Sequence, residues 1–220
     1  MYWQLQDKSE GAAHGLLVEL MAALAKVAEC DFQAYAMPLT RVQKMVEQGL
    51  MDGMVNIVNP DRLVYALASA EPLIRGKVSI FVRKDSAALE RLKTVKTLDD
   101  LAATGVSVNA MLGSGWIKTN LEARGMEVFY GQGTTGAVKM LIGKRGDVVV
   151  DMSANINWLL KDMPGGQDVV ELPQTLETVG WHVLISKRSP YAKEMPLIDK
   201  ALASLKASSQ YKVIVKKYLG

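Results

Sequence analysis

The sequence predicts an α/β fold in two lobes that are joined by two extended strands. Apolar helices and short β-branched strands alternate along most of the 220 residues, as in βα units with parallel sheets. A faint repeat, KMVEQGLMD at 44–52 and KMLIGKRGD at 139–147, places Lys-Met and an Asp at the same offsets before a buried strand. Two further strands, 77–84 and 180–187, bracket the second copy. Together these features predict similar lobes that close over a small molecule about a two-strand hinge.

Hydrophobic spacing and turn residues predict the individual elements. Apolar residues at helical spacing indicate helices, continuous β-branched runs indicate buried strands, and glycine or proline ends most elements. The predicted helices are 14–29, 40–49, 113–125, 136–144 and 153–161, with two more after Ser189. Besides the two hinge strands, the predicted strands are 32–37, 54–58, 105–110, 126–130 and 147–151.

Composition argues against several classes of protein. With 49% hydrophobic and 22% charged residues, the chain is globular rather than disordered. The net charge of +3 is small and the basic residues are scattered, so we expect no nucleic-acid partner. No apolar stretch approaches the roughly 20 residues that cross a bilayer, so we expect no membrane insertion. Cys30 is the single cysteine, and His14 and His182 lie far apart, so we expect neither a disulfide framework nor a metal site.

The sequence also contains no catalytic motif, so we expect a binding protein without a cofactor rather than an enzyme. One motif competes with that expectation, because GQGTTG at 131–136 has the glycine spacing of a dinucleotide-binding turn. However, fifteen positions separate Gly136 from Asp151, against about 20 in dinucleotide-binding motifs. We therefore expect this segment to be a flexible loop.

Arg62 is the first candidate for ligand binding. The run Met54 to Val58 is mostly apolar, and Asn59-Pro60 ends it with a turn. Arg62 therefore follows the carboxyl end of a buried strand, where open α/β sheets bind their ligands. A guanidinium group has the planar fork that matches a carboxylate. The alternative is an ordinary solvated arginine on a loop.

The order of several segments resembles extracellular solute-binding protein family 3, the periplasmic proteins that feed polar amino acids to ABC importers. The resemblance rests on MPLTRVQKMVEQGLMDG, NPDRLVYALASAEPLIRGKVSIFVRK, TLDDLAATGVSV and GDVVVDMSANINWLL, and continues to SSQYKVIVKKYLG. It implies the type II periplasmic-binding-protein fold, with residues 1–82 and 183–220 in lobe 1 and 83–182 in lobe 2. It also implies an amino-acid-like ligand in the cleft, an ABC permease as partner and a periplasmic location, the leader being absent from this chain.

The resemblance assigns roles to particular residues. Arg62 falls where the family grips the ligand carboxylate, and Asp151 where an acidic residue meets the ammonium group. Asp151 could instead cap the helix that begins at Ser153. Ser114 and Gly115 open a helix where the family surrounds the carboxylate with N–H groups and a hydroxyl, although Gly115 replaces the usual threonine. As an alternative, Ser114 is an ordinary helix cap.

Other positions depart from the family pattern, so the resemblance does not determine which ligand binds. Leu39 stands where an aromatic residue often covers the ligand side chain, and Asn56 and Asn59 replace a serine and a threonine. Tyr2 or Trp3 would form the other aromatic wall, unless both belong to the core. The same features fit two alternative functions, namely a ligand-sensing domain for a signalling partner and a cyclohexadienyl-dehydratase-like lyase.

The start of the chain resembles family members only from a point after their first strand. We therefore expect the sequence to lack that strand or to carry a misassigned start, with YWQLQ at 2–6 or a neighbouring molecule as a replacement.

Overall fold

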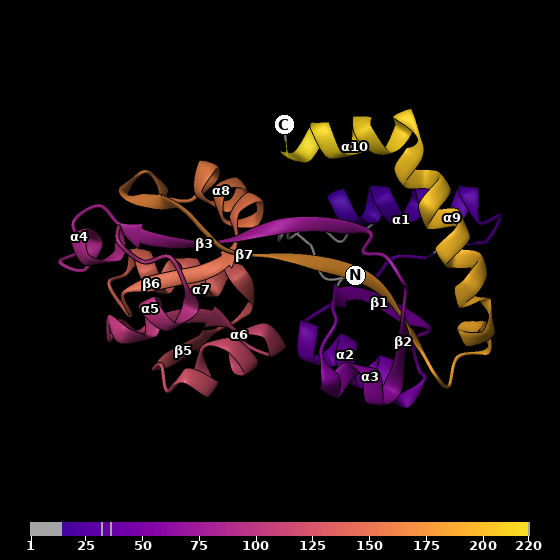
Figure 1. The fold of residues 1–220 in the computed structure, drawn as a ribbon, viewed down its shortest axis with the longest axis horizontal. Coiled ribbons are helices and arrows are strands. Elements are labelled where there is room, and N and C mark those ends of the chain that lie inside the picture. The colour runs from indigo at the N-terminus through magenta and orange to yellow at the C-terminus, as the bar shows by residue number, and fades with distance from the viewer. Residues whose placement is uncertain (1–14, 32, 36, 220) are drawn as a thin grey trace. The chain divides into compact units, whose positions relative to one another are not determined.

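The computed structural model describes residues 15–31, 33–35 and 37–219. The chain divides into two compact units (Figure 1). The first unit runs to Arg75 and resumes at Gly180, and the second unit is Gly76–Val179. The chain passes between the units twice, within strand β3 (Ile74–Arg83) and within strand β7 (Val169–Ser186). Two extended segments therefore connect the units.

In the first unit, two strands pair with the last part of β7. Strand β1 (Gly53–Ile57) and strand β2 (Ala66–Ala68) are both antiparallel to it, and Asn56 lies opposite His182. The helices of this unit are α1 (Leu16–Val27), α2 (Leu39–Gln48), α3 (Pro60–Tyr65), the 3-10 helix η3 (Pro190–Glu194), α9 (Met195–Ala207) and α10 (Ser209–Leu219).

Two groups of contacts hold the first unit together. Val42 and Val46 of α2 pack with Met54 of β1 and Leu184 of β7 in one buried cluster. Helix α1 packs against α9 and α10, which come from the other end of the chain. The C-terminal part of the protein thereby completes the unit that the N-terminal part begins.

The second unit has the strand order β3-β6-β4-β5, and β3 also neighbours β7. Strands β4 (Val108–Met111), β5 (Val128–Gly131) and β6 (Val148–Met152) are parallel, whereas β3 is antiparallel to β6. The helices are α4 (Leu89–Leu92), α5 (Leu98–Ala103), α6 (Gly115–Asn120), η1 (Glu122–Arg124), α7 (Gly133–Ile142), α8 (Ser153–Asp162) and η2 (Gly166–Asp168).

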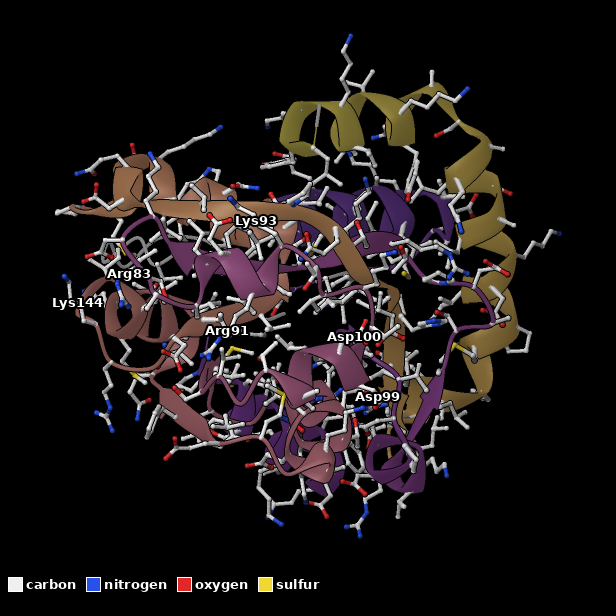
Figure 2. The ribbon with its side chains drawn as sticks, turned by 60° about the vertical axis from the view of Figure 1, so that its left-hand side comes forward. Arg83, Arg91, Lys93, Asp99, Asp100 and Lys144 are labelled. Carbon is white, nitrogen blue, oxygen red and sulfur yellow. The ribbon has the colours of Figure 1, made fainter. Side chains whose placement is uncertain are left out.

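A cluster that includes Phe81, Val138 and Ile156 forms the core of the second unit. Figure 2 labels several charged side chains of this unit, among them Arg83 and Lys144. The Arg83 side chain, 14% exposed, donates from Nη1 to the Leu141 carbonyl at 3.0 Å and pairs through Nε with Asp85 at 3.1 Å. The Lys144 backbone nitrogen donates to the same carbonyl at 3.1 Å, so Arg83 adds a second, charged donor at the last turn of α7, where a cation is favourable. Arg83 therefore fastens the end of β3 to the end of α7.

Most predicted helices and strands are present, but several expectations were wrong. Not all sheet pairing is parallel, because both described pairs in the first unit and the β3–β6 pair are antiparallel. The last hinge strand begins at Val169 rather than at residue 180. GQGTTG is no flexible loop: Gly131 ends β5 and α7 begins at Gly133. A Cβ on Gly131 would lie 2.6 Å from the Ala137 nitrogen, so this glycine permits close packing of strand against helix.

The described residues of the predicted strand 32–37 are not in a strand, and YWQLQ at 2–6 lies outside the described residues. Along residues 15–31, 33–35 and 37–219, no helix has the length and apolarity that crossing a membrane requires.

Candidate ligand-binding site

The local sequence around Arg62 fixes its backbone at the end of β1. Asn59 is the N-cap of α3, and its Oδ1 accepts a hydrogen bond from the Arg62 backbone nitrogen at 2.9 Å. Pro60 occupies the first turn, where its fixed φ suits a helix start. The sequence correctly predicts that Arg62 follows a buried strand, and the Asn-Pro turn is the reason.

The guanidinium group of Arg62 is buried, with the residue only 2% exposed. Its Nη1 donates to the Ile57 carbonyl at 2.6 Å. Its Nε is buried without a hydrogen-bond partner, and no carboxylate among the described residues forms an ion pair with Arg62. Burial lowers the pKa of Arg62, an effect that nearby Tyr65 and Asp61 oppose. Arginine nevertheless stays charged in proteins. A buried cation of this kind requires an anion to offset its lost hydration.

Two other predicted ligand-binding residues belong to the first unit. Asn56 lies on β1, and Leu39 lies at the start of α2. Asn56, on β1, is 7% exposed, and its Oδ1 accepts from the Ile57 nitrogen at 2.8 Å. Its Nδ2 is buried and has no partner in the described part of the chain. Leu39 is the first residue of α2 and is 4% exposed. Tyr2 and Trp3 lie outside the described residues.

Asp151, in the second unit, is near the carboxyl end of β6. Its Oδ1 accepts from the Met152 nitrogen at 2.7 Å, and its Oδ2 accepts from the Thr134 hydroxyl at 3.4 Å. Burial raises the pKa of Asp151 to about 6, and these two hydrogen bonds lower it by less. The alternative role as a helix cap was wrong, because the N-cap of α8 is Met152 and no side chain caps that helix.

Ser114 and Gly115 follow β4, the strand beside β6. Ser114 is the N-cap of α6, where its hydroxyl accepts from the Ile117 nitrogen at 3.4 Å, and Gly115 is the first residue of this helix. The carboxyl ends of parallel strands lie at one edge of a sheet. The second unit therefore gathers Ser114, Gly115 and Asp151 along that edge.

Two side chains near the predicted residues were missed. Thr134, at the start of α7, contacts both Asp151 and the Met111 sulfur, the latter at 3.7 Å. Sequence reasoning missed Thr134 because it treated GQGTTG as a loop. The position of this threonine just after a predicted strand could have indicated a site residue. His182 lies opposite Asn56 in β7. Nothing local in the sequence gives this register.

The geometry leaves one buried arginine without an acidic partner and one half-buried carboxylate without a basic partner, each within its own unit of the described chain. No group of three or more histidine, cysteine or acidic side chains among the described residues could hold a metal ion. These two side chains can therefore bind groups of opposite charge.

Solved structures have the same fold. An ancestral arginine-binding protein bound to glutamine gives a TM-score of 0.76 at 23% identity, with 96% of this chain and 91% of that chain covered. A histidine kinase sensor domain with similarity to periplasmic binding proteins gives 0.74 at 18% identity, covering 94% and 86%. The substrate-binding protein of an amino acid ABC transporter gives 0.74 at 16% identity, covering 93% and 87%.

The fold is thus the two-lobed α/β fold of the periplasmic binding proteins. A search of curated proteins finds no match to the chain. The family model of the bacterial extracellular solute-binding proteins, family 3, matches residues 3–220. Because that match spans nearly the whole sequence, the chain belongs to the family 3 bacterial extracellular solute-binding proteins.

Proposed function

We propose that the protein binds a free amino acid or a similar small zwitterion and delivers it to an ABC importer. Arg62 holds the ligand carboxylate, and Asp151 is the partner of the ammonium group. The observation that carries the proposal is the buried Arg62 guanidinium, whose Nε lacks a partner and which no described carboxylate neutralises. In this proposal Asn59 of the first unit, with Ser114 and Gly115 of the second unit, also contacts the ligand.

The chemistry of Arg62 suits a carboxylate better than a neutral ligand. A carboxylate accepts two parallel hydrogen bonds from a guanidinium, and such charge-assisted bonds are about twice as strong as neutral ones. The Ile57 carbonyl already holds Nη1 at 2.6 Å, so the fork is fixed before a ligand arrives. A fixed fork loses little conformational entropy on binding.

Asp151 complements this role by its charge. A ligand ammonium group beside a half-buried carboxylate favours the ionised form and replaces hydration that burial removed. A zwitterion therefore supplies both charges that the two side chains lack.

Delivery to a permease and a periplasmic location are part of the proposal because the family is extracellular and one similar structure is the binding protein of an amino acid ABC transporter. The second candidate is a sensor domain, which the similar histidine kinase structure favours. Neighbouring genes distinguish the two. A permease and an ATPase support import, whereas a kinase or cyclase supports sensing.

A thermal-shift screen with the common amino acids, followed by calorimetry, tests the binding function. A ligand at a hundredfold excess over its Kd adds about 2.7 kcal/mol to the free energy of unfolding. We expect Arg62→Ala to abolish measurable binding, and Arg41→Ala, which removes an exposed arginine of α2 in the same unit, to leave it unchanged. Intact binding in Arg62→Ala would show that the carboxylate lies elsewhere. Turnover of prephenate or arogenate would instead support the lyase.

A further inference from the structure

Asn56 and His182 form a polar pair on one face of the first unit's sheet. They lie directly opposite each other in the antiparallel pairing of β1 with β7. Side chains of such partners share a face, with Cβ atoms about 4.5–5.5 Å apart. The neighbouring pair on that face, Met54 and Leu184, belongs to the buried apolar cluster beneath α2. The polar pair therefore lies next to this apolar cluster on the same face of the sheet.

The hydrogen bonds fix which atom of Asn56 is free. Its Oδ1 accepts from the Ile57 backbone nitrogen at 2.8 Å, and only the oxygen end of an amide can do this. The free end is therefore the NH2 group, Nδ2, which is buried without a partner in the described chain. A buried donor without an acceptor costs about 1–3 kcal/mol. Such a group in a native protein calls for an explanation.

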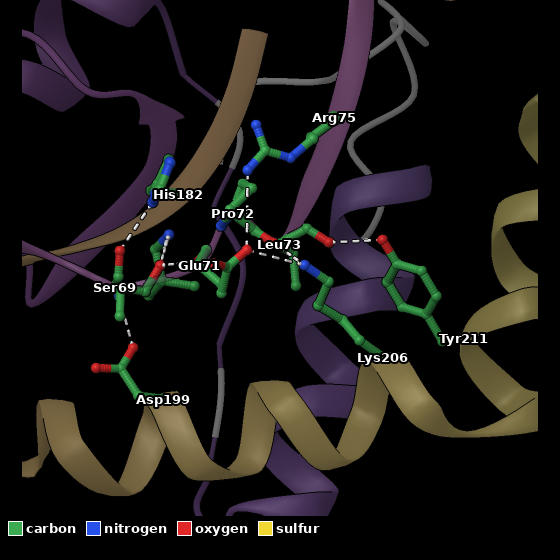
Figure 3. Close-up of polar contacts among 11 residues, drawn as sticks. Ser69, Glu71, Pro72, Leu73, Arg75, His182, Asp199, Lys206 and Tyr211 are labelled. Atoms are coloured by element: carbon green, nitrogen blue, oxygen red, sulfur yellow. Dashed lines mark hydrogen bonds and ion pairs between the residues drawn. The ribbon is translucent and has the colours of Figure 1, made fainter.

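A hydrogen bond also fixes the orientation of the His182 ring. Its Nδ1 lies 2.8 Å from the Ser69 carbonyl, which can only accept, so Nδ1 carries the hydrogen. Figure 3 shows the hydrogen bond between His182 and Ser69, with the neighbouring hydrogen bonds as dashed lines. The Ser69 nitrogen donates to the Val183 carbonyl at 2.8 Å, and the next nitrogen, that of Ala70, donates to Asp199 of α9 at 2.8 Å. In the neutral ring, Nε2 is then an acceptor on a side chain that is only partly buried.

Asn56 also lies close to Arg62 along the chain, and the pairing of β1 with β7 brings His182 opposite Asn56. Arg62 Nη1 bonds the carbonyl of Ile57, the residue that follows Asn56. A ligand whose carboxylate reaches Arg62 at the end of β1 thus has a neighbouring donor in Asn56 and an acceptor in His182. A primary carboxamide presents the complementary groups, because its oxygen accepts and its NH2 donates.

We propose that Asn56 and His182 recognise a side-chain carboxamide, so that the ligand is an amide amino acid. The ligand oxygen accepts from Asn56 Nδ2, and the ligand NH2 donates to His182 Nε2. Ser69 acts as a positioning residue through the His182 ring. The inference rests on the proposed function, since it needs the ligand carboxylate at Arg62.

The experiment is calorimetry at pH 8, where histidine side chains are ordinarily neutral. The probes are L-glutamine and L-asparagine, the matching acids L-glutamate and L-aspartate, and L-norvaline, which lacks the amide. We expect the better amide to bind at least about tenfold more tightly than its acid and than norvaline. Norvaline leaves the buried Asn56 Nδ2 without an acceptor, and the acid has no NH2 group to donate to His182 Nε2.

Asn56→Asp replaces the donor with an acceptor and should weaken amide binding by about tenfold or more while changing norvaline binding little. Gln210→Glu, the same amide-to-acid change on the exposed face of α10, is the matched control. If Asn56→Asp does not fold, Asn56→Ser keeps an acceptor near the Ile57 nitrogen and removes the NH2 donor.

Equal affinity for amide, acid and norvaline would overturn the inference, as would an equal loss of all three in the variant. If amino acids bind through Arg62 without preferring a carboxamide, only this inference fails. If none of the probes and no common amino acid binds the wild type, the proposed function fails with it.

Discussion

Asp151→Asn should stabilise the unliganded protein at neutral pH. Burial raises the pKa of the carboxyl from its ordinary 3.8 to about 6, so the folded protein holds this proton more tightly than the unfolded chain does. Above pH 6 the ionised carboxylate therefore destabilises the folded state. At about 1.4 kcal/mol for each pH unit, the full cost is about 3 kcal/mol. Solvent reaches part of the side chain and reduces this to roughly 1–3 kcal/mol.

The asparagine variant removes that cost and keeps the geometry. Its side-chain oxygen still accepts from the Met152 nitrogen. The new NH2 group donates to the Thr134 hydroxyl, which in turn donates to the Met111 sulfur that it already contacts. At pH 7.5 we expect the Tm to rise by several degrees, given roughly 2–4 °C per kcal/mol for a protein of this size. The difference should shrink as the pH falls from 6 and vanish near pH 4.

Thermal unfolding of the ligand-free protein between pH 4 and 8 measures this effect. Asp162→Asn, at an exposed aspartate at the end of α8, controls for the loss of one negative charge. The reasoning is refuted if Asp151→Asn has an unchanged or lower Tm at pH 7.5. It is equally refuted if a gain in Tm persists unchanged at pH 4.

Two further predictions concern the second unit. Arg83→Met should lower the free energy of unfolding in urea by about 1–3 kcal/mol, because the Leu141 carbonyl loses a charged donor; a change within error would show that solvent replaces the bond. Gly146→Ala should cost more than Gly105→Ala in the same assay. Both glycines have φ near +70°, but a Cβ at Gly146 would lie 2.6 Å from the Asn109 side chain, whereas nothing lies within 4 Å at Gly105. Equal losses would mean that strain in φ alone decides the effect.

Local signals predict the position of Arg62, and long-range pairing decides what surrounds it. The apolar run and the Asn-Pro turn show that Arg62 follows a buried strand. Its burial depends on the reach of its side chain back to the Ile57 carbonyl, which no spacing rule describes. The neighbour of Asn56 depends on the register with β7, and strands 126 positions apart in sequence carry no local mark of it. The sequence therefore predicts where a residue lies along an element better than it predicts which residues contact it.

Two errors in the predicted fold have local causes. Pro173 lies inside β7, and proline ordinarily argues against a strand, so the first half of β7 was missed. The glycines of GQGTTG resemble a mobile loop in composition, yet Gly131 and Gly136 are in close contact. Glycine serves close packing as well as turns, and sequence alone does not separate the two. The same ambiguity hid Thr134 beside Asp151.

The division of the chain has a consequence for the order in which the protein folds. The second unit is one continuous stretch, so its core can form as soon as Val179 is available. The first unit closes late, because Lys217 and Tyr218 of α10 both donate to Glu19 of α1 at 2.6 Å, across almost the full length of the chain. Contacts of such separation form slowly. During synthesis, the N-terminal third must therefore wait for the last two helices, and the apolar side of α1 stays exposed until they form.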